Sequence, residues 1–187
     1  MPDSEPRPAP GVLLLAHPML SDPNFRRAVV LLCEHTDEGS FGLILNKPLA
    51  LELGEVVEDL SSSVQVSLGG PVQPNTLHYL HRHRDVLSDS VKVTADVAWG
   101  GDFDLVKALV LSEEASPESL RFFLGYSGWS AGQLEEEIEE GGWILTGLDD
   151  PELSFPDDPE RLWRIVLRRM GGEYAYLANF PDDPRMN

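Results

Sequence analysis

No apolar run in this chain is longer than six residues, and the longest covers residues 28–33 (AVVLLC). A membrane-spanning helix needs roughly 18 or more consecutive apolar residues, so the sequence predicts no membrane segment. Short apolar runs that end at Gly, Pro or polar residues are typical of buried β-strands. A chain of 187 residues is long enough to build one core, and we therefore expect short strands packed against helices.

The expected strands and helices follow from these patterns. Strand-like segments cover residues 11–16, 27–35, 41–46, 64–68, 76–81, 120–126 and 143–146. Five polar residues with one glycine, 36–40, join the second and third segments as a hairpin. Apolar residues at helical spacing predict helices over 51–60, 102–111, 134–140 and 159–170, with helical turns after Asp22 and at Pro117. This order favours one α+β domain over a regular βαβ winding.

The two ends of the chain differ from its middle. Residues 1–10 contain four prolines and little to bury, so they are predicted to be a disordered tail, and residues 181–187 a flexible one. Residues 11–180 contain no repeat and no linker-like stretch, which predicts a single domain.

The charge balance is strongly acidic. The chain has 32 Asp and Glu against 14 Lys and Arg, a formal net charge of -18. Nucleic-acid phosphates and anionic lipids both need a cationic surface, so we expect neither as a direct partner. A single cysteine excludes an internal disulfide, and no secretory signal is visible, which favours the cytoplasm.

Two groups of residues raise the question of catalysis or metal binding. Cys33 and His35 share one face of a predicted strand, so a hydrolase that uses this pair is an alternative reading; no third orienting group is visible. His78, His81 and His83 have a spacing that divides them between two strand faces, and arginines lie between them. We therefore predict no metal site, and no sequence motif indicates a cofactor.

Three turn-like segments concentrate residues of unusual type. They are Asn46, Lys47 and Pro48; Gly69, Gly70 and Pro71; and Gly128, Trp129 and Gln133. Loops carry function more often than the elements that they connect, so we expect these segments to gather into one groove for a ligand or partner. Residues 130–133 also have the spacing of a helix capping box, and the glutamates that follow are interpreted as a solvated helix face.

Six blocks of the sequence resemble a known family. They are GVLLLAHP at residues 11–18, DPNF at 22–25, CEH at 33–35, GLILNKP at 42–48, GGPV at 69–72 and GYSGWSAGQLEEE at 125–137. Their order and spacing are similar to the YqgE/AlgH family of small bacterial proteins. His17 is a departure, because the family more often has a small or apolar residue there.

The resemblance implies a fold and only a modest statement of function. The fold is a single α+β domain whose mixed, mainly antiparallel sheet curls into a partial barrel with flanking helices. The family has no agreed catalytic residues, and some members carry the label of transcriptional regulator. At -18, regulation would have to act through a protein partner or a small ligand rather than through DNA contact. We therefore expect a non-enzymatic binding module; the alternatives are the Cys33–His35 hydrolase and a nucleic-acid-binding regulator.

Overall fold

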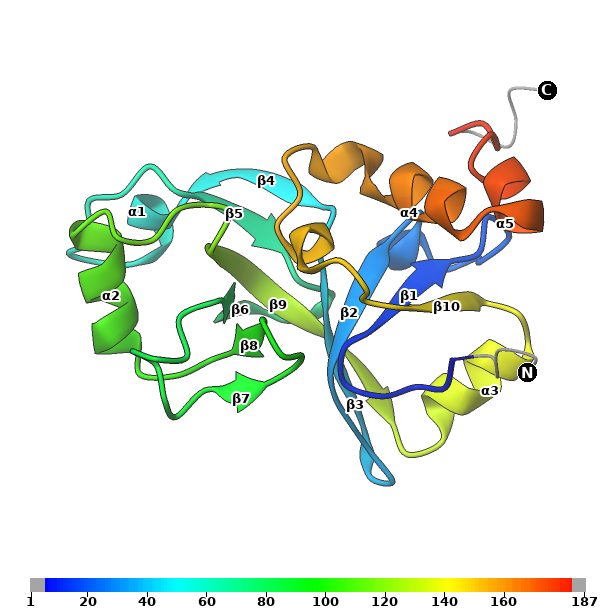
Figure 1. Ribbon diagram of the computed structural model, residues 1–187, viewed down its shortest axis with the longest axis horizontal. Helices are drawn as coiled ribbons and strands as arrows, with labels where there is room; N and C mark the ends of the chain where they lie inside the picture. Colours follow the sequence, from blue (N-terminus) through cyan, green and yellow to red (C-terminus); the bar gives the residue numbers. More distant parts are fainter. Residues whose placement is uncertain (1–5, 183–187) are drawn as a thin grey trace.

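A long strand, β9 (Leu120–Ser130), connects two lobes of the molecule (Figure 1). The computed structural model describes residues 6–182; the outer parts of the predicted tails, 1–5 and 183–187, lie outside the described residues. Strand β9 pairs with β6 along one edge, and with β5 and then β3 along the other. Its position makes it the element on which residues from both lobes meet.

The first lobe, called the β1 lobe, holds one end of the sheet. Its strands are β1 (Val12–Ala16), β2 (Val29–Thr36), β3 (Gly39–Ile44) and β10 (Trp143–Gly147), in the antiparallel order β10-β1-β2-β3. Its helices are α3 (Gln133–Glu139), α4 (Leu162–Met170) and α5 (Gly172–Leu177), and three short 3-10 turns are η1 (Pro23–Phe25), η2 (Pro151–Ser154) and η3 (Pro159–Arg161).

Both faces of β1 are buried, which explains its uninterrupted apolar sequence. Leu13 and Leu15 pack in a core that includes Trp163 of α4. Leu14, on the opposite face, packs in a second core that includes Leu134 of α3. The sheet of this lobe is therefore covered by helices on both sides, as fully buried strands require.

The second lobe, called the β6 lobe, lies on the left in Figure 1. Its strands are β4 (Pro48–Glu52), β5 (Gln65–Leu68), β6 (Val72–His81), β7 (Val91–Lys92) and β8 (Ala98–Trp99). Its helices are α1 (Leu53–Val56) and α2 (Phe103–Leu111), and a third core lies between α2 and the strands. The pairing of β5 with β9 is parallel, and the other pairings are antiparallel.

The predicted fold class is confirmed. The protein has five helices in the described residues and one mixed, mainly antiparallel sheet that curls without closing into a barrel. The hairpin at residues 36–40 forms as expected, and Asp22 and Asp102 cap η1 and α2 through their carboxylates. No helix among residues 6–182 is both long and apolar enough to cross a membrane.

Several expected elements were wrong. The helix predicted over residues 51–60 is mostly absent: β4 continues to Glu52, and α1 is a single turn that ends at Val56. The helical turn at Pro117 is a non-helical turn. Ala9 belongs to the predicted disordered tail, yet it packs against the second core and accepts a hydrogen bond from the Val12 amide.

Candidate functional site

Asn46 and Lys47 fasten the start of β2. The Asn46 amide oxygen accepts from the Val29 N–H at 2.8 Å, and its nitrogen donates to the Arg27 carbonyl at 2.8 Å. The Lys47 Nζ donates to the Arg26 carbonyl at 2.9 Å, and burial lowers the pKa of this amine. Pro48 begins β4. Asn46 is thus buried and engaged within the chain, and Lys47 is partly buried beside it.

Gly69 and Gly70 form a close backbone crossing with β9. The Gly69 carbonyl accepts from the Ile44 N–H at 2.9 Å and from the Ser127 hydroxyl at 3.1 Å. A Cβ atom on Gly70 would lie 2.2 Å from the Tyr126 carbonyl carbon. The crossing therefore needs glycine for space, and the exposed Pro71 follows it.

Gly128 and Trp129 are part of β9 and not of a loop, which corrects the sequence prediction. The Trp129 Nε1–H donates to Glu137 Oε2 at 3.0 Å, and the Trp143 Nε1–H donates to the same oxygen at 2.7 Å. The Gln133 side chain accepts from the Ser130 N–H, but Gly132, in a left-handed conformation, is the residue before α3. The predicted capping box is therefore only partly formed.

The nine predicted groove residues do not share one groove. The segments at Asn46 and Gly69 meet through the backbone, since the Leu68 N–H donates to the Lys47 carbonyl at 2.8 Å. Gly128 lies near them, with its Cβ position 3.8 Å from a Val72 methyl group. Trp129 instead packs with Trp143 in the second core, and Gln133 is exposed on α3. These residues serve mainly to pack and join the two lobes.

Cys33 and His35 are not arranged as a catalytic pair. Cys33 is fully buried in the first core, where its Sγ lies 3.7 Å from the Leu31 carbonyl oxygen and burial raises the pKa of the thiol. His35 lies beyond an irregularity in the β2–β3 pairing; its Nδ1 is 2.7 Å from the Ser40 hydroxyl and its Nε2 is 3.4 Å from Glu135. A buried neutral thiol with no contact to an imidazole cannot act as the nucleophile.

The three histidines of β6 and the following turn have separate partners. His78 Nε2 lies 3.0 Å from the Thr76 hydroxyl, His81 Nε2 2.9 Å from the Gly100 carbonyl, and His83 Nε2 2.9 Å from the Ser119 hydroxyl. Over residues 6–182 no three His, Cys, Asp or Glu side chains gather closely enough to hold a metal ion.

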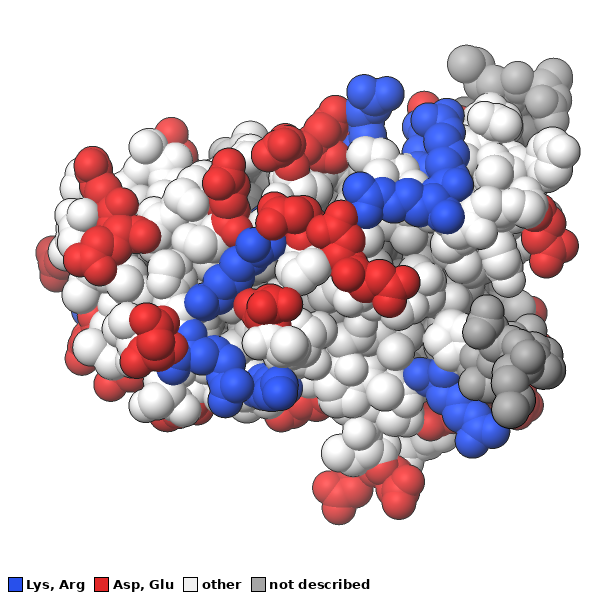
Figure 2. All heavy atoms as spheres, viewed as in Figure 1, with Lys and Arg blue, Asp and Glu red and all other residues white. Residues whose placement is uncertain are grey.

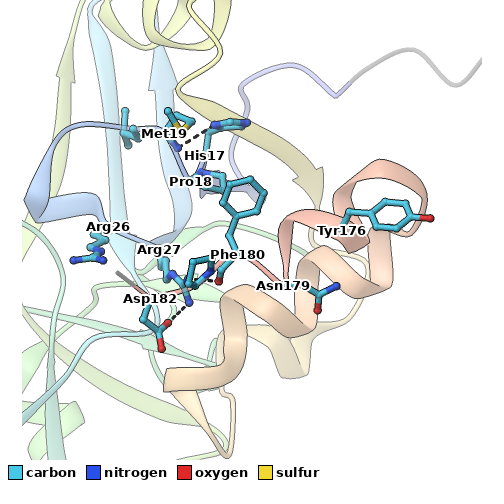
Figure 3. Close-up of a pocket in the computed structure, with 11 residues that line it drawn as sticks. His17, Pro18, Met19, Arg26, Arg27, Tyr176, Asn179, Phe180 and Asp182 are labelled. Atoms are coloured by element: carbon cyan, nitrogen blue, oxygen red, sulfur yellow. Dashed lines mark hydrogen bonds and ion pairs between the residues drawn. The ribbon is translucent and has the colours of Figure 1, made fainter. Parts of the chain in front are cut away.

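A cavity of about 480 Å³ lies between η1 and the end of the described chain (Figure 3). Its walls include Pro18, Met19 and Phe180, and Figure 3 shows Phe180 reaching toward Pro18. The Arg27 guanidinium at its edge pairs with Asp182 and also donates to the Phe180 carbonyl. We call this the C-terminal cavity; its walls are mostly apolar, and Arg27 is already engaged by the chain itself.

A second hollow, of about 460 Å³, opens on the other side of the β2–β3 hairpin. Four half-buried rings meet in it: the ring centroid of Phe41 lies 4.5 Å from that of Trp99, 4.9 Å from Tyr126 and 5.4 Å from His78. The rings come from β3, β8, β9 and β6, four strands that are distant in sequence. We call this the aromatic hollow.

The electrostatics of the aromatic hollow favour cations. Glu34 and Glu38 line it and are exposed, and its lining includes neither Lys nor Arg. Burial lowers the pKa of His78, so this ring is neutral at pH 7. Thr76 Oγ1 donates to the Gln73 carbonyl and must accept from His78 Nε2–H, which leaves Nδ1 as the acceptor of the ring. Figure 2 shows acidic side chains at the tip of the hairpin beside it.

Sequence reasoning missed the aromatic hollow because its rings lie far apart along the chain. Of its lining residues, Trp129 is predicted from the sequence as a groove residue, and His78 is considered there only as a possible metal ligand. The alternation of Phe41 with buried Gly42 in β3 gives no local sign that the ring meets β8 and β9. The hollow exists only because β9 brings both lobes together.

Comparison with known proteins agrees with this fold. A family model described as AlgH-like matches residues 13–175. A UPF0301 protein of Chlorobaculum tepidum is 45% identical over 95% of this chain and 95% of its own length, and one of Cytophaga hutchinsonii is 45% identical over 95% and 98%.

Two solved structures share the architecture. The solution structure of the AlgH protein from Pseudomonas aeruginosa is similar with a TM-score of 0.75 and 29% identity, over 97% of this chain and 98% of that one. The crystal structure of a Corynebacterium diphtheriae protein has a TM-score of 0.77 at 23% identity, over 95% of each chain, and supports the fold alone. On the family match and the relatives at 45% identity, this chain belongs to the AlgH-like family.

Proposed function

We propose that the protein is a non-enzymatic binding module that recognises an arginine side chain in a basic segment of a protein partner. The observation that carries this proposal is the aromatic hollow, whose lining combines the packed rings of Phe41, His78, Trp99 and Tyr126 with the carboxylates of Glu34 and Glu38. A cationic group gains from aromatic faces and from carboxylates together.

Arginine suits this hollow better than lysine. The planar guanidinium stacks on aromatic rings and is more weakly hydrated than an ammonium group, so it loses less on leaving water. The neutral His78 offers a lone pair to one of its five N–H donors. The chain's net charge of -18 adds long-range attraction for a basic partner and repels nucleic acids.

A protein partner fits the position of the site. The hollow lies along the β2–β3 hairpin, whose tip projects from the body of the molecule in Figure 1. A projecting edge with exposed acidic residues is open to a macromolecule. We place this binding in the cytoplasm, where a single reduced cysteine is expected, and any regulatory role would be indirect, through the partner.

The experiment compares three peptides of equal length by isothermal titration calorimetry: acetyl-(Gly-Arg)4-amide, acetyl-(Gly-Lys)4-amide and acetyl-(Gly-Gln)4-amide. The arginine peptide is expected to bind about threefold or more tightly than the lysine peptide, because both carry the same charge and differ in stacking. The glutamine peptide should not bind. Trp99→Leu should remove the preference for arginine over lysine.

Substitutions of two exposed glutamates distinguish the effect of carboxylates at the hollow from the effect of the chain's net charge. Glu38 lines the hollow, so Glu38→Gln should weaken binding of the arginine peptide. Glu136 is an exposed glutamate on α3 outside the hollow, so Glu136→Gln should leave this binding unchanged. Both positions are exposed, so both variants should fold. Equal binding of the arginine and lysine peptides, or equal weakening by the two glutamate variants, would contradict the proposal.

A further inference from the structure

A third cavity, of about 460 Å³, lies where the two lobes meet, and it is lined by a partly buried arginine. It is bounded by β5, by the start of β9 and by residues 155–159, which follow η2. Polar side chains in its wall include Gln65, Ser67, Ser116 and Arg121. We call it the Arg121 cavity.

The Arg121 guanidinium is held by neutral oxygens. Its Nη1 donates to the Ser154 carbonyl at 3.1 Å, and its Nη2 donates to the Leu45 carbonyl at 3.0 Å and to the Ser67 hydroxyl at 3.1 Å. The group also lies over the Phe123 ring, 5.0 Å from its centroid. A guanidinium has five N–H donors, so these three bonds leave the Nε–H and one Nη1–H without a partner among the described residues.

Arg121 has no anionic partner among the described residues. Arg27, Arg82, Arg164 and Arg169 each lie within 4.0 Å of a carboxylate, whereas no carboxylate of residues 6–182 comes that close to Arg121. Burial alone lowers its pKa to about 10, so it remains charged at neutral pH. The two acids in the cavity wall, Glu118 and Asp157, are exposed at its rim.

Further donors beside Arg121 also lack acceptors. The Ser154 hydroxyl is buried and has no hydrogen-bond partner among the described residues, although its own carbonyl holds Arg121. The Ser67 hydroxyl accepts from Arg121, so its proton is available to another acceptor. Arg121 and Ser67 both line the cavity, so one anion there would provide acceptors for the remaining donors of both side chains.

We infer that the Arg121 cavity binds a small molecule with an oxyanion group, a carboxylate or a phosphate, held by the remaining N–H donors of Arg121 and by the Ser67 hydroxyl. Charge-assisted N–H···O bonds from a guanidinium suit both groups. The cavity is larger than either group alone, so it has room for the remainder of the ligand. This site is separate from the aromatic hollow and does not depend on its function.

The test is calorimetric titration of the full chain with inorganic phosphate and, separately, with citrate, at constant ionic strength set with KCl. Saturable binding of at least one probe is expected; binding of phosphate alone or of citrate alone identifies the preferred oxyanion. Arg121→Met should weaken that binding about tenfold or more, because it removes the positive charge and its N–H donors. Ser67→Ala should weaken it by a smaller factor.

Arg161→Gln is the matched control, because Arg161 is an exposed arginine on η3 outside the cavity wall. It should leave the binding of both probes unchanged. Ser67→Ala removes a single hydroxyl and keeps the experiment decisive if Arg121→Met fails to fold. The inference is overturned if neither probe binds saturably to the unaltered protein, or if Arg161→Gln weakens binding as much as the cavity variants.

Discussion

The aromatic hollow and the Arg121 cavity have opposite electrostatic character, although the same strand supplies residues to both. The hollow presents ring faces and exposed glutamates and has no cation in its lining. The cavity has a partly buried guanidinium whose three hydrogen bonds all go to neutral oxygens. Tyr126 and Arg121 lie five positions apart on β9.

This difference shows that a chain's net charge describes its long-range field and not its individual sites. A charge of -18 disfavours binding of a polyanion across the surface. It does not disfavour a small anion in a cavity, where the nearest charges and the buried donors decide the binding energy. One chain can therefore offer one site for a cation and another for an anion.

The largest effect is expected from Gly70→Ala, which disturbs the crossing that lies between the two sites. The new Cβ would lie 2.2 Å from the Tyr126 carbonyl, and backbone must shift to relieve the overlap. We expect a loss of about 3 kcal/mol in the free energy of unfolding, measured with urea. Binding of the arginine peptide at the aromatic hollow and of the anion at the Arg121 cavity should weaken together, because β9 supplies residues to both sites.

Gly132→Ala is the matched control for that prediction. Gly132 has a φ of 78° but nothing within 4 Å of its Cβ position. It should cost only about 1 kcal/mol, the penalty of a left-handed residue. If the two substitutions cost the same, backbone conformation rather than the close crossing explains the need for Gly70.

The sequence predicted best those features that depend on neighbours along the chain. The hairpin at residues 36–40 and the caps at Asp22 and Asp102 are local, and they formed as expected. The helix over 51–60 failed because Leu53, Val56, Val57 and Leu60 are apolar at a spacing that a strand end and one helical turn also satisfy. There, pairing of β4 with β5 overrides the local preference.

The two sites could not be predicted in this way. The rings of the aromatic hollow occupy residues 41, 78, 99 and 126, and tertiary pairing alone brings them together. Arg121 resembles an outward-facing charge in an alternating strand, and its burial comes from residues 154–159, far along the chain. The single arginine within the otherwise apolar and aromatic segment LRFFLGY is the sequence signal of this site.

Glu137→Leu should change the aromatic hollow and spare the Arg121 cavity. The substitution leaves the buried Trp129 and Trp143 indole N–H groups without their shared acceptor. The expected loss is about 2 kcal/mol in urea unfolding, since unsatisfied buried donors are costly. Weaker binding of the arginine peptide with unchanged anion binding would sharpen the distinction between the two sites. The control is Glu136→Leu at the neighbouring position, which should change the free energy of unfolding very little.

Arg121→Met should have a smaller effect on stability than on binding. Removing a buried charge relieves its desolvation cost, while the Leu45 and Ser154 carbonyls lose a donor, so the two changes oppose each other. Without added anions we expect a change of about 1 kcal/mol or less in urea unfolding. In phosphate or citrate, the unaltered protein alone should gain stability. A large loss without anions would make Arg121 a structural residue.

The smallest effect is expected from Asp182→Asn, which removes an exposed carboxylate that pairs with Arg27 and Arg164. Arg27 and Arg164 hold the pKa of the Asp182 carboxyl below its usual value. A pKa lowered in the folded state adds stability above the unfolded pKa, and this contribution disappears as the pH falls through the folded value. The carboxylate side chain is 79% exposed, so solvent screening limits the contribution to about 0.5 kcal/mol.

Unfolding should therefore be measured by urea at neutral pH and near pH 2, for the unaltered protein and for Asp182→Asn. The small difference at neutral pH is expected to vanish in acid, where both side chains are neutral. An anion in the Arg121 cavity should stabilise the folded chain more than Asp182 does, because the anion and Arg121 would be less exposed to solvent than the Asp182 ion pairs. Asp182→Asn could instead cost as much free energy of unfolding as a saturating anion adds. In that case the environment of Arg121 gives its ion pair no advantage over the exposed pair at Asp182, and the contrast between the two regions fails.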